Sequence, residues 1–308
     1  MGLKKDAAEK GLEVATDLVK NNATNVLGML FPFAGVKKKA VEMYMEDIEK
    51  SDLPKETKYG LLLNMKKEFK RLKNQKAVAQ IALDNAKEGT DFSEKSGVNE
   101  EWFERYMDAA KFVSSEDMQL IWGKILAGEF EKPGSTPPNM IRILSEMTPE
   151  LAKDFSIICC MTVSLREIKG NGFTDIEQRM IIVPYNHFRN FCRTFGLGLR
   201  VLSELDALGV IKLNSKGYKY RASHRRKILI YVEKKFEIIE SNTWLPTGNV
   251  FLTSVGESLR RIIQTFEIDC YNEMVKEYML ENGVKFEDKN DYIIEKNEDT
   301  YIVIKKNK

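Results

Sequence analysis

The stretch SSEDMQLIWGKILAGEFEKPG, residues 114–134, decides the fold class of this chain. Ser114 precedes Asp117 by three residues, a spacing at which Ser114 caps a helix and Asp117 reciprocates. The apolar residues that follow recur every three or four positions, as on one buried helix face: Met118, Ile121, Trp122, Ile125 and Leu126. Gly128 is expected to end the helix with a positive φ, before a turn at Pro133-Gly134. The stretch predicts a buried helix inside a helical domain.

A second helix is predicted before it, between about residues 55 and 86, with Pro54 in its first turn. Its apolar residues keep helical spacing: Leu61, Leu62, Met65, Phe69 and Leu72. The other face is basic: Lys66, Lys67, Lys70, Arg71 and Lys73. A run of this kind is usually a solvated face, and a contact with phosphates or anionic lipid is the alternative.

An apolar segment at residues 26–36 is interrupted by Pro32 and runs into three lysines. Its 11 residues are too few to span a bilayer core, which takes about 20. One interpretation is a buried hairpin between helices. The other is a re-entrant or interfacial membrane contact. The candidate membrane residues are Leu30, Phe31, Phe33, Lys37, Lys38 and Lys39.

The pattern changes after Gly170-Asn171-Gly172, where strands join the helices. Two helical segments are followed by a predicted β-hairpin that turns at residues 214–217, the order of a winged-helix module. Residues 161–235 carry 15 basic and 6 acidic side chains, which favours a nucleic-acid contact. The candidate residues are Arg189, Arg193, Arg200, Lys216, Lys219, Arg221, Arg225, Arg226 and Lys227. Winged helices also dock proteins, so a scaffold or protein-contact role stays open.

The stretch WGKILAGE at residues 122–129, with Pro133-Gly134 and the later Leu252-Thr253-x-x-Gly256-x-x-Leu259, resembles a bacterial family of unknown function. The resemblance covers roughly residues 95–270. The chain is also similar to phage-defence proteins of the abortive-infection alpha type, which combine an apolar N-terminal region with a helical body. This resemblance implies a role in phage defence and supplies no catalytic residue.

Catalytic motifs are scarce in the sequence. The chain has only two histidines, His187 and His224, and no C-x-x-C pair. Neither of the phosphate-binding glycine motifs G-x-x-x-x-G-K-S/T and G-x-G-x-x-G occurs. The remaining enzyme hypothesis is a metal-dependent nuclease that uses Glu233 and Lys235 as an E-x-K pair. We therefore expect no enzymatic activity, no metal and no cofactor.

The sequence thus predicts a mainly α fold with small β elements, of the α+β class. The predicted domains are an N-terminal helical region (1–91), a central helical domain (92–168) and a winged-helix-like domain with a terminal β-hairpin (169–308). The predicted function is non-catalytic phage defence through binding of a phage or host component. The alternatives are a nucleic-acid-binding regulator and the nuclease. Expected partners are a phage or host protein, a second copy of the chain, DNA or RNA, and an anionic membrane surface. We expect the protein in the cytoplasm or peripherally at the inner membrane.

Overall fold

A computed structural model describes residues 29, 30, 33, 38–169, 172, 173, 178–181, 194–221, 226–231, 235–240, 244–288, 291–297 and 300–305. The chain divides into two compact units, Met1–Ser145 and Glu146–Lys308. The predicted boundary near residue 92 falls inside the first unit, because helices on both sides of it pack together.

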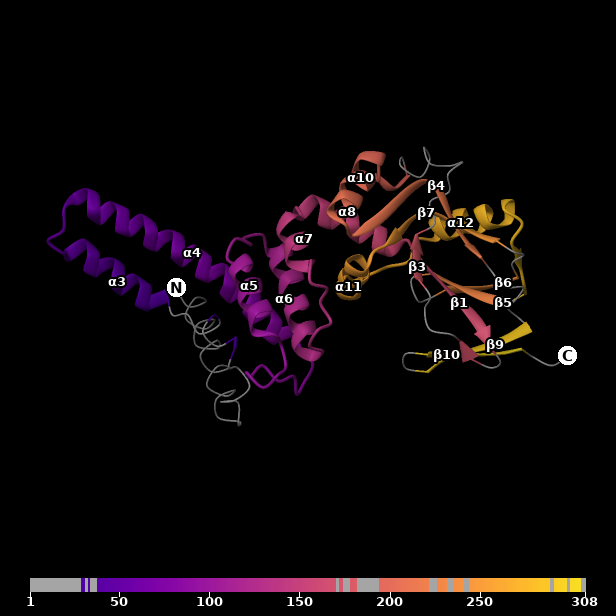
Figure 1. The fold of residues 1–308 in the computed structure, drawn as a ribbon, viewed down its shortest axis with the longest axis horizontal. Helices are drawn as coiled ribbons and strands as arrows, with labels where there is room; N and C mark the ends of the chain where they lie inside the picture. Colours follow the sequence, from indigo (N-terminus) through magenta and orange to yellow (C-terminus); the bar gives the residue numbers. More distant parts are fainter. Residues whose placement is uncertain are drawn as a thin grey trace, which may run out of the picture. The chain divides into compact units, whose positions relative to one another are not determined.

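The first unit is helical (Figure 1). Its described helices are α3 (Lys38–Lys50), α4 (Lys55–Asn85), α5 (Glu100–Ala110), α6 (Glu116–Glu131) and α7 (Met140–Glu146). The predicted long helix is thus confirmed as α4, and Pro54 is its N-cap residue. The first half of α4 pairs with α3 in a helical hairpin, and its second half packs along α6.

Aromatic rings fill the core of this unit around Trp122, which is fully buried on α6. Tyr106 on α5 lies with its ring centre 4.8 Å from that of Trp122, and its hydroxyl donates to the Trp122 carbonyl at 2.7 Å. Gly123 lets α6 approach α4, since an added Cβ would lie 2.3 Å from Ile81 Cγ2. The predicted buried helix is therefore confirmed, and its glycine has a packing role.

Two details of that helix differ from the prediction. Ser115, one residue later than predicted, is the N-cap, and its side chain makes no capping hydrogen bond. Gly128 lies inside α6, which continues to Glu131. The positive φ falls instead at Gly134, in the turn. The buried carboxylate of Glu129 holds that turn by accepting from the amides of Gly134 (2.6 Å) and Thr136 (2.8 Å), so the helix continues past Gly128.

The second unit combines an antiparallel sheet with four described helices (Figure 1). The helices are α8 (Pro149–Cys160), α10 (Leu199–Leu208), α11 (Ser254–Ile262) and α12 (Asp269–Glu281). The sheet strands are β1 (Thr162–Lys169), β2 (Gly172–Phe173), β3 (Gln178–Ile181), β4 (Ile211–Arg221), β5 (Arg226–Tyr231), β6 (Lys235–Glu240), β7 (Trp244–Leu252) and β8 (Lys285–Phe286). Their order is β4-β7-β3-β1-β5-β6-β8, with β2 on β1. The terminal hairpin is confirmed as β9 (Tyr292–Asn297) paired with β10 (Thr300–Lys305).

Short-range signals set the helix ends in this unit. Thr148 caps α8 by accepting from the Leu151 amide, and Pro149 lies in the first turn. Gly209 ends α10 with a φ of 94°. Thr253 caps α11 by accepting from the Gly256 amide at 3.1 Å, and its hydroxyl donates to the Gly209 carbonyl at 2.7 Å. Thr253 thereby ties the start of one helix to the end of another.

The α+β class is confirmed, because helices make up more of the described chain than strands. The predicted two-stranded wing is wrong. Residues 211–221 form one irregular strand, β4, and both of its halves pair with β7: Leu213 lies opposite Val250 and Tyr218 opposite Gly248. Asn249 reaches across to the Asn214 carbonyl at 2.9 Å, so the predicted turn is a bulge within the sheet.

Candidate polyanion-binding surface

Four exposed lysines follow one another along α4 and are here called the lysine stripe: Lys66, Lys67, Lys70 and Lys73. Residues three and four apart share a helix face, so the four ammonium groups project from neighbouring positions. None of them forms an ion pair within the part of the chain that the structure describes. Half-buried Leu62, Met65 and Phe69 lie beside the stripe on the same helix. The stripe is therefore a band of uncompensated positive charge.

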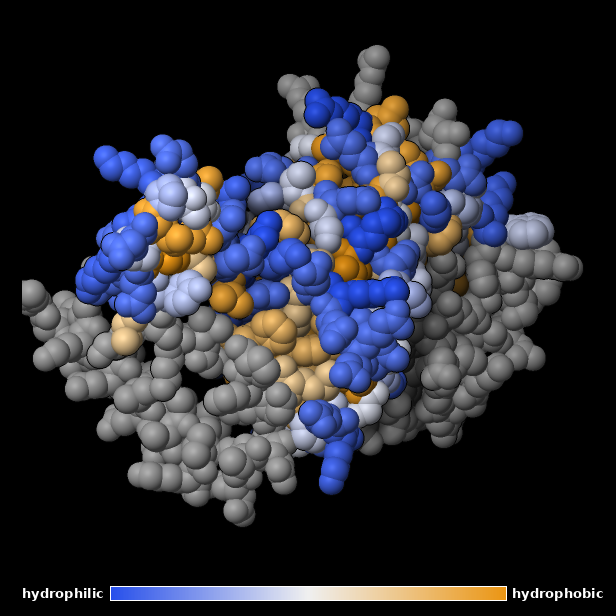
Figure 2. Space-filling model, turned by 60° about the vertical axis from the view of Figure 1, so that its left-hand side comes forward, coloured by the Kyte–Doolittle hydropathy of each residue, from blue (hydrophilic) through white to orange (hydrophobic). Residues whose placement is uncertain are grey.

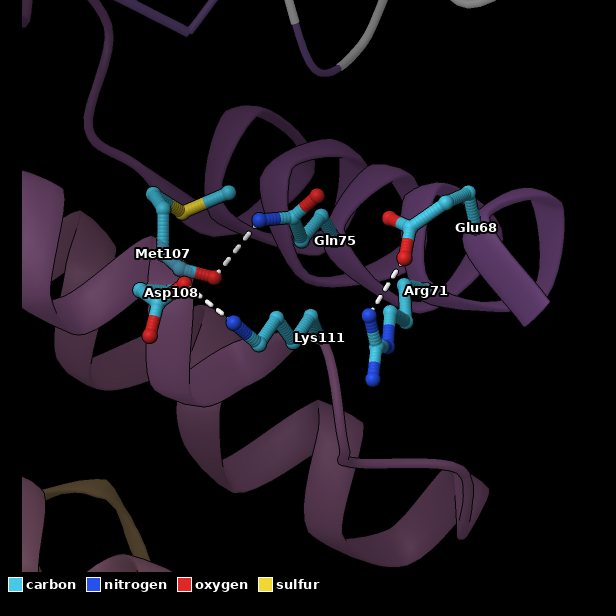
Figure 3. Close-up of polar contacts among 6 residues, drawn as sticks. All are labelled: Glu68, Arg71, Gln75, Met107, Asp108 and Lys111. Carbon is cyan, nitrogen blue, oxygen red and sulfur yellow. Dashed lines mark hydrogen bonds and ion pairs between the residues drawn. The ribbon is translucent and has the colours of Figure 1, made fainter. Parts of the chain in front are cut away.

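Two buried amide side chains lie on the next turn of α4 and fix the end of α5. Gln75 Nε2 donates to the Met107 carbonyl at 2.8 Å, and Asn74 Nδ2 donates to the Lys111 carbonyl at 2.9 Å. The last carbonyls of a helix have no partner within it, so these bonds satisfy groups that would otherwise be buried without one. Figure 3 shows Gln75 reaching across from α4 to Met107.

The chain then turns at residues 111–113, here called the 111–113 turn, and presents an exposed aromatic ring. Phe112 is 65% exposed. The guanidinium carbon of Arg71 lies 5.5 Å from the centre of its ring, and the Lys111 ammonium lies 5.1 Å from it. Glu68 pairs with Arg71, and Asp108 with Lys111 (Figure 3). These carboxylates orient the two cations over the ring.

The lysine stripe and the 111–113 turn together form a basic surface with an aromatic group at one end. Lys70 and Asn74 are one helical turn apart, so the stripe leads directly to the bonded end of α5. In Figure 2, which brings the left-hand side of Figure 1 forward, hydrophilic residues cover much of the described surface and hydrophobic ones show between them. Lysine ammonium groups bind phosphates as point charges and release counterions when they do so. Chemically, the surface suits a polyanion.

The described basic residues predicted in the second unit lie on different elements. Lys216 and Lys219 are exposed on β4, an edge strand, whereas Arg226 and Lys227 belong to β5, with β7, β3 and β1 between the two strands. The backbone of Arg221 lies at the end of β4. Arg189, Arg193 and Arg225 lie outside the described residues.

Part of the charge near β4 is already neutralised. Arg200 pairs with Glu204 on α10 at 2.9 Å, and this bond raises the pKa of the Arg200 guanidinium. Lys212 Nζ lies 3.5 Å from Asp206 Oδ1. These carboxylates lower the local positive charge, so the edge of the sheet is a weaker polyanion site than α4.

The candidate membrane residues are described only in part. Leu30 is fully buried, and the ring of Phe33 lies edge-on to Phe103 at 5.9 Å. For these two side chains the buried-hairpin interpretation is favoured. Phe31 and Lys37 lie outside the described residues, and of Lys38 and Lys39 only the backbone, at the start of α3, is described. No described helix combines the length and apolar character needed to cross a bilayer.

Glu233, the carboxylate of the proposed E-x-K pair, lies outside the described residues, as do both histidines, His187 and His224. Lys235, the other member of the E-x-K pair, begins β6. Among the described residues, no group of three or more His, Cys, Asp or Glu side chains is placed to hold a metal ion. The nuclease hypothesis therefore stays untested.

Comparison with protein families gives one match, to the family described as a protein of unknown function, DUF2806, over residues 63–276. This match covers more than half of the chain. The chain belongs to the DUF2806 family. No curated protein and no solved structure matches it. The predicted membership of an uncharacterised domain family is thereby confirmed, and the similarity to abortive-infection alpha proteins stays a prediction.

The DUF2806 region begins within α4 and ends within α12, so it takes in parts of both units. The lysine stripe and the 111–113 turn lie inside it, as do residues 122–129 and the helix cap at Thr253. Sequence reasoning found the stripe but missed Asn74, Gln75 and Phe112. The only signal for them was a polar pair, Asn74-Gln75, on the buried side of an otherwise amphipathic helix.

Proposed function

We propose that this DUF2806 protein is a non-catalytic binding protein of phage defence, and that it binds nucleic acid through the lysine stripe and the 111–113 turn. The bound component would be phage or host DNA or RNA in the cytoplasm. The phage-defence setting is supported by the similarity to abortive-infection alpha proteins. The choice of ligand is supported by the chemistry of the surface.

One observation carries the choice of ligand: four exposed lysines on consecutive turns of α4, none of which is paired within the described chain. Lysines facing solvent repel one another at close spacing, and a row of phosphates removes that repulsion while releasing counterions. Arg71 and Lys111, each paired with a carboxylate, add cationic groups at the end of the stripe next to Phe112. The lysine and arginine side chains are expected to contact phosphates and not base edges. Binding should therefore show little sequence preference.

The test is a fluorescence anisotropy titration of labelled oligonucleotides with the full-length protein at low salt. The stripe variant carries Lys66→Ala, Lys67→Ala, Lys70→Ala and Lys73→Ala. The matched control carries Lys212→Ala, Lys216→Ala and Lys219→Ala, which removes exposed lysines from β4. We expect the stripe variant to bind at least roughly tenfold more weakly than wild type and the control to bind nearly as well.

Circular dichroism confirms that each variant is folded before its affinity is compared. The proposal is overturned if the wild-type protein binds no nucleic acid. It is equally overturned if the stripe variant keeps full affinity, or if the β4 control loses as much affinity as the stripe variant does.

A further inference from the structure

We infer that Phe112 is a stacking platform for an unpaired base, so that the ligand of this surface is single-stranded nucleic acid. This inference rests on the proposed function and makes it more specific. It concerns the nature of the strand, whereas the lysine stripe concerns only its phosphates.

Phe112 gains little from folding, because most of its ring stays in water. A single exposed phenylalanine is ordinary on a protein surface and needs no explanation by itself. The surroundings of this one are less ordinary, because three side-chain amides from two other helices bond to carbonyls on either side of the ring. The Asn74 amide donates to the Lys111 carbonyl, and the Gln75 amide donates to the Met107 carbonyl. The Gln119 amide, on α6, donates to the Val113 carbonyl at 2.8 Å.

These bonds hold the 111–113 turn in place on both sides of the exposed ring. Phe112 N also donates to the Ala109 carbonyl at 3.2 Å, and Val113 N to that of Ala110 at 3.0 Å. A turn fixed in this way presents its aromatic side chain at small entropic cost when a ligand arrives. The ring is thus pre-positioned on the surface and does not have to be ordered by binding.

The charges around the ring suit a nucleotide. Arg71 and Lys111 lie within 5.5 Å of the ring centre, each oriented by its own carboxylate. A base that stacks on Phe112 therefore brings its own phosphate close to two cations, and the strand continues over Lys70 and Lys67, which share a face of α4 with Asn74 and Arg71. Aromatic side chains interleaved with cations along a groove or ridge are the usual means of binding single strands without sequence preference.

A duplex does not use such a ring. Its bases are stacked on one another and face their partners, so an aromatic group that projects from a rigid turn meets only sugars and phosphates. Duplex binding would therefore depend on the lysines alone. This difference separates the contribution of Phe112 from that of the stripe.

The experiment compares the full-length protein with three variants on a labelled single strand of mixed sequence and on the same strand in a duplex. Phe112→Ala removes the ring, Phe112→Trp replaces it with a larger aromatic system, and Phe266→Ala removes a comparably exposed phenylalanine from the second unit. We expect Phe112→Ala to weaken single-strand binding by roughly tenfold and to leave duplex binding unchanged. Phe112→Trp should bind the single strand at least as well as wild type, and Phe266→Ala should match wild type.

The outcomes distinguish the two claims. If Phe112→Ala binds the single strand as well as wild type while the stripe variant still loses affinity, the stacking inference is wrong and the proposed function survives. If the wild-type protein prefers the duplex, the inference is also wrong. If no variant and no wild-type protein binds either ligand, the proposed function itself fails.

Discussion

At the scale of single residues, Gly123 shows how one missing side chain sets a helix contact. An added Cβ would lie 2.3 Å from Ile81 Cγ2 and 2.5 Å from Ile81 Cβ, too close for a rotamer change to relieve. Gly123→Ala is expected to lower the free energy of unfolding by about 1–3 kcal/mol through overpacking. Gly128→Ala is the matched control: a Cβ there meets nothing within 4 Å, so it should stabilise α6 by about 0.4–1 kcal/mol. Urea denaturation measures both, and equal effects at the two glycines would contradict the account.

Tyr106 provides a second prediction at this scale. Burial, and to a smaller extent the charge of Glu129, raises the pKa of Tyr106 well above its usual value of 10.0. The unfolded chain therefore loses this proton at a lower pH than the folded chain, and stability is fully present below pH 10 and falls as the pH rises past it. Tyr106→Phe should remove part of this alkaline loss.

The measurement is the midpoint of urea unfolding between pH 8 and pH 11. At pH 8 Tyr106→Phe should be less stable than wild type by about 1 kcal/mol, because the bond to the Trp122 carbonyl is lost. The difference in the free energy of unfolding between wild type and Tyr106→Phe should become smaller as the pH rises. A gap that stays constant up to pH 11 would show that the Tyr106 hydroxyl does not couple to folding.

At the scale of elements, the cap of α11 connects two pieces of local structure. Thr253 Oγ1 accepts from the Gly256 amide and donates to the Gly209 carbonyl, so one hydroxyl serves the start of α11 and the end of α10. Thr253→Val keeps the shape of the side chain and removes both bonds. We expect it to lower the free energy of unfolding by about 1–2 kcal/mol.

Ser258→Ala is the control for that change, because the Ser258 hydroxyl bonds only to the Ser254 carbonyl one turn back, on an exposed part of the same helix. It should change stability by less than about 0.5 kcal/mol. Thermal unfolding followed by circular dichroism compares the two variants. If they are equally stable, the double role of Thr253 is wrong.

The elements that the sequence predicted correctly are those whose signals are short in range. The start of α4 after Pro54 and the apolar spacing of α6 each depend on residues within a few positions. Strand pairing, in contrast, depends on residues that are far apart in the sequence. A turn-like sequence at residues 214–217 looks the same in a hairpin and in a bulge, and the deciding partner, β7, lies more than 20 residues further along the chain.

At the scale of the whole molecule, the distribution of charge matters more than its sum. The net charge is only +2, which predicts no general attraction to polyanions. The lysine stripe concentrates positive charge on one face of α4, while acidic residues elsewhere balance it. Binding through a local surface of this kind is expected to respond to changes in the stripe far more than to changes in the net charge.

The candidate site could be predicted from the sequence only in its first half. The lysines at residues 66–73 are neighbours along one helix, so spacing alone places them together. The 111–113 turn joins them through contacts between residues 37 and 32 positions apart, Asn74 with Lys111 and Gln75 with Met107. The periodicity of apolar residues in a sequence gives no sign of contacts between residues so far apart along the chain. Conversely, the described basic residues predicted in the second unit are close in sequence but lie on α10 and on two separate strands, β4 and β5.

The salt dependence of nucleic-acid binding tests the central claim most directly. The logarithm of the binding constant, plotted against the logarithm of the salt concentration, falls with a slope of about −0.7 per neutralised phosphate for a single strand. If the four stripe lysines each contact a phosphate, the slope for the Lys66→Ala, Lys67→Ala, Lys70→Ala and Lys73→Ala variant should be shallower than that of wild type by roughly 3. Equal slopes for the two proteins would mean that the stripe does not contact the phosphates and would contradict the account.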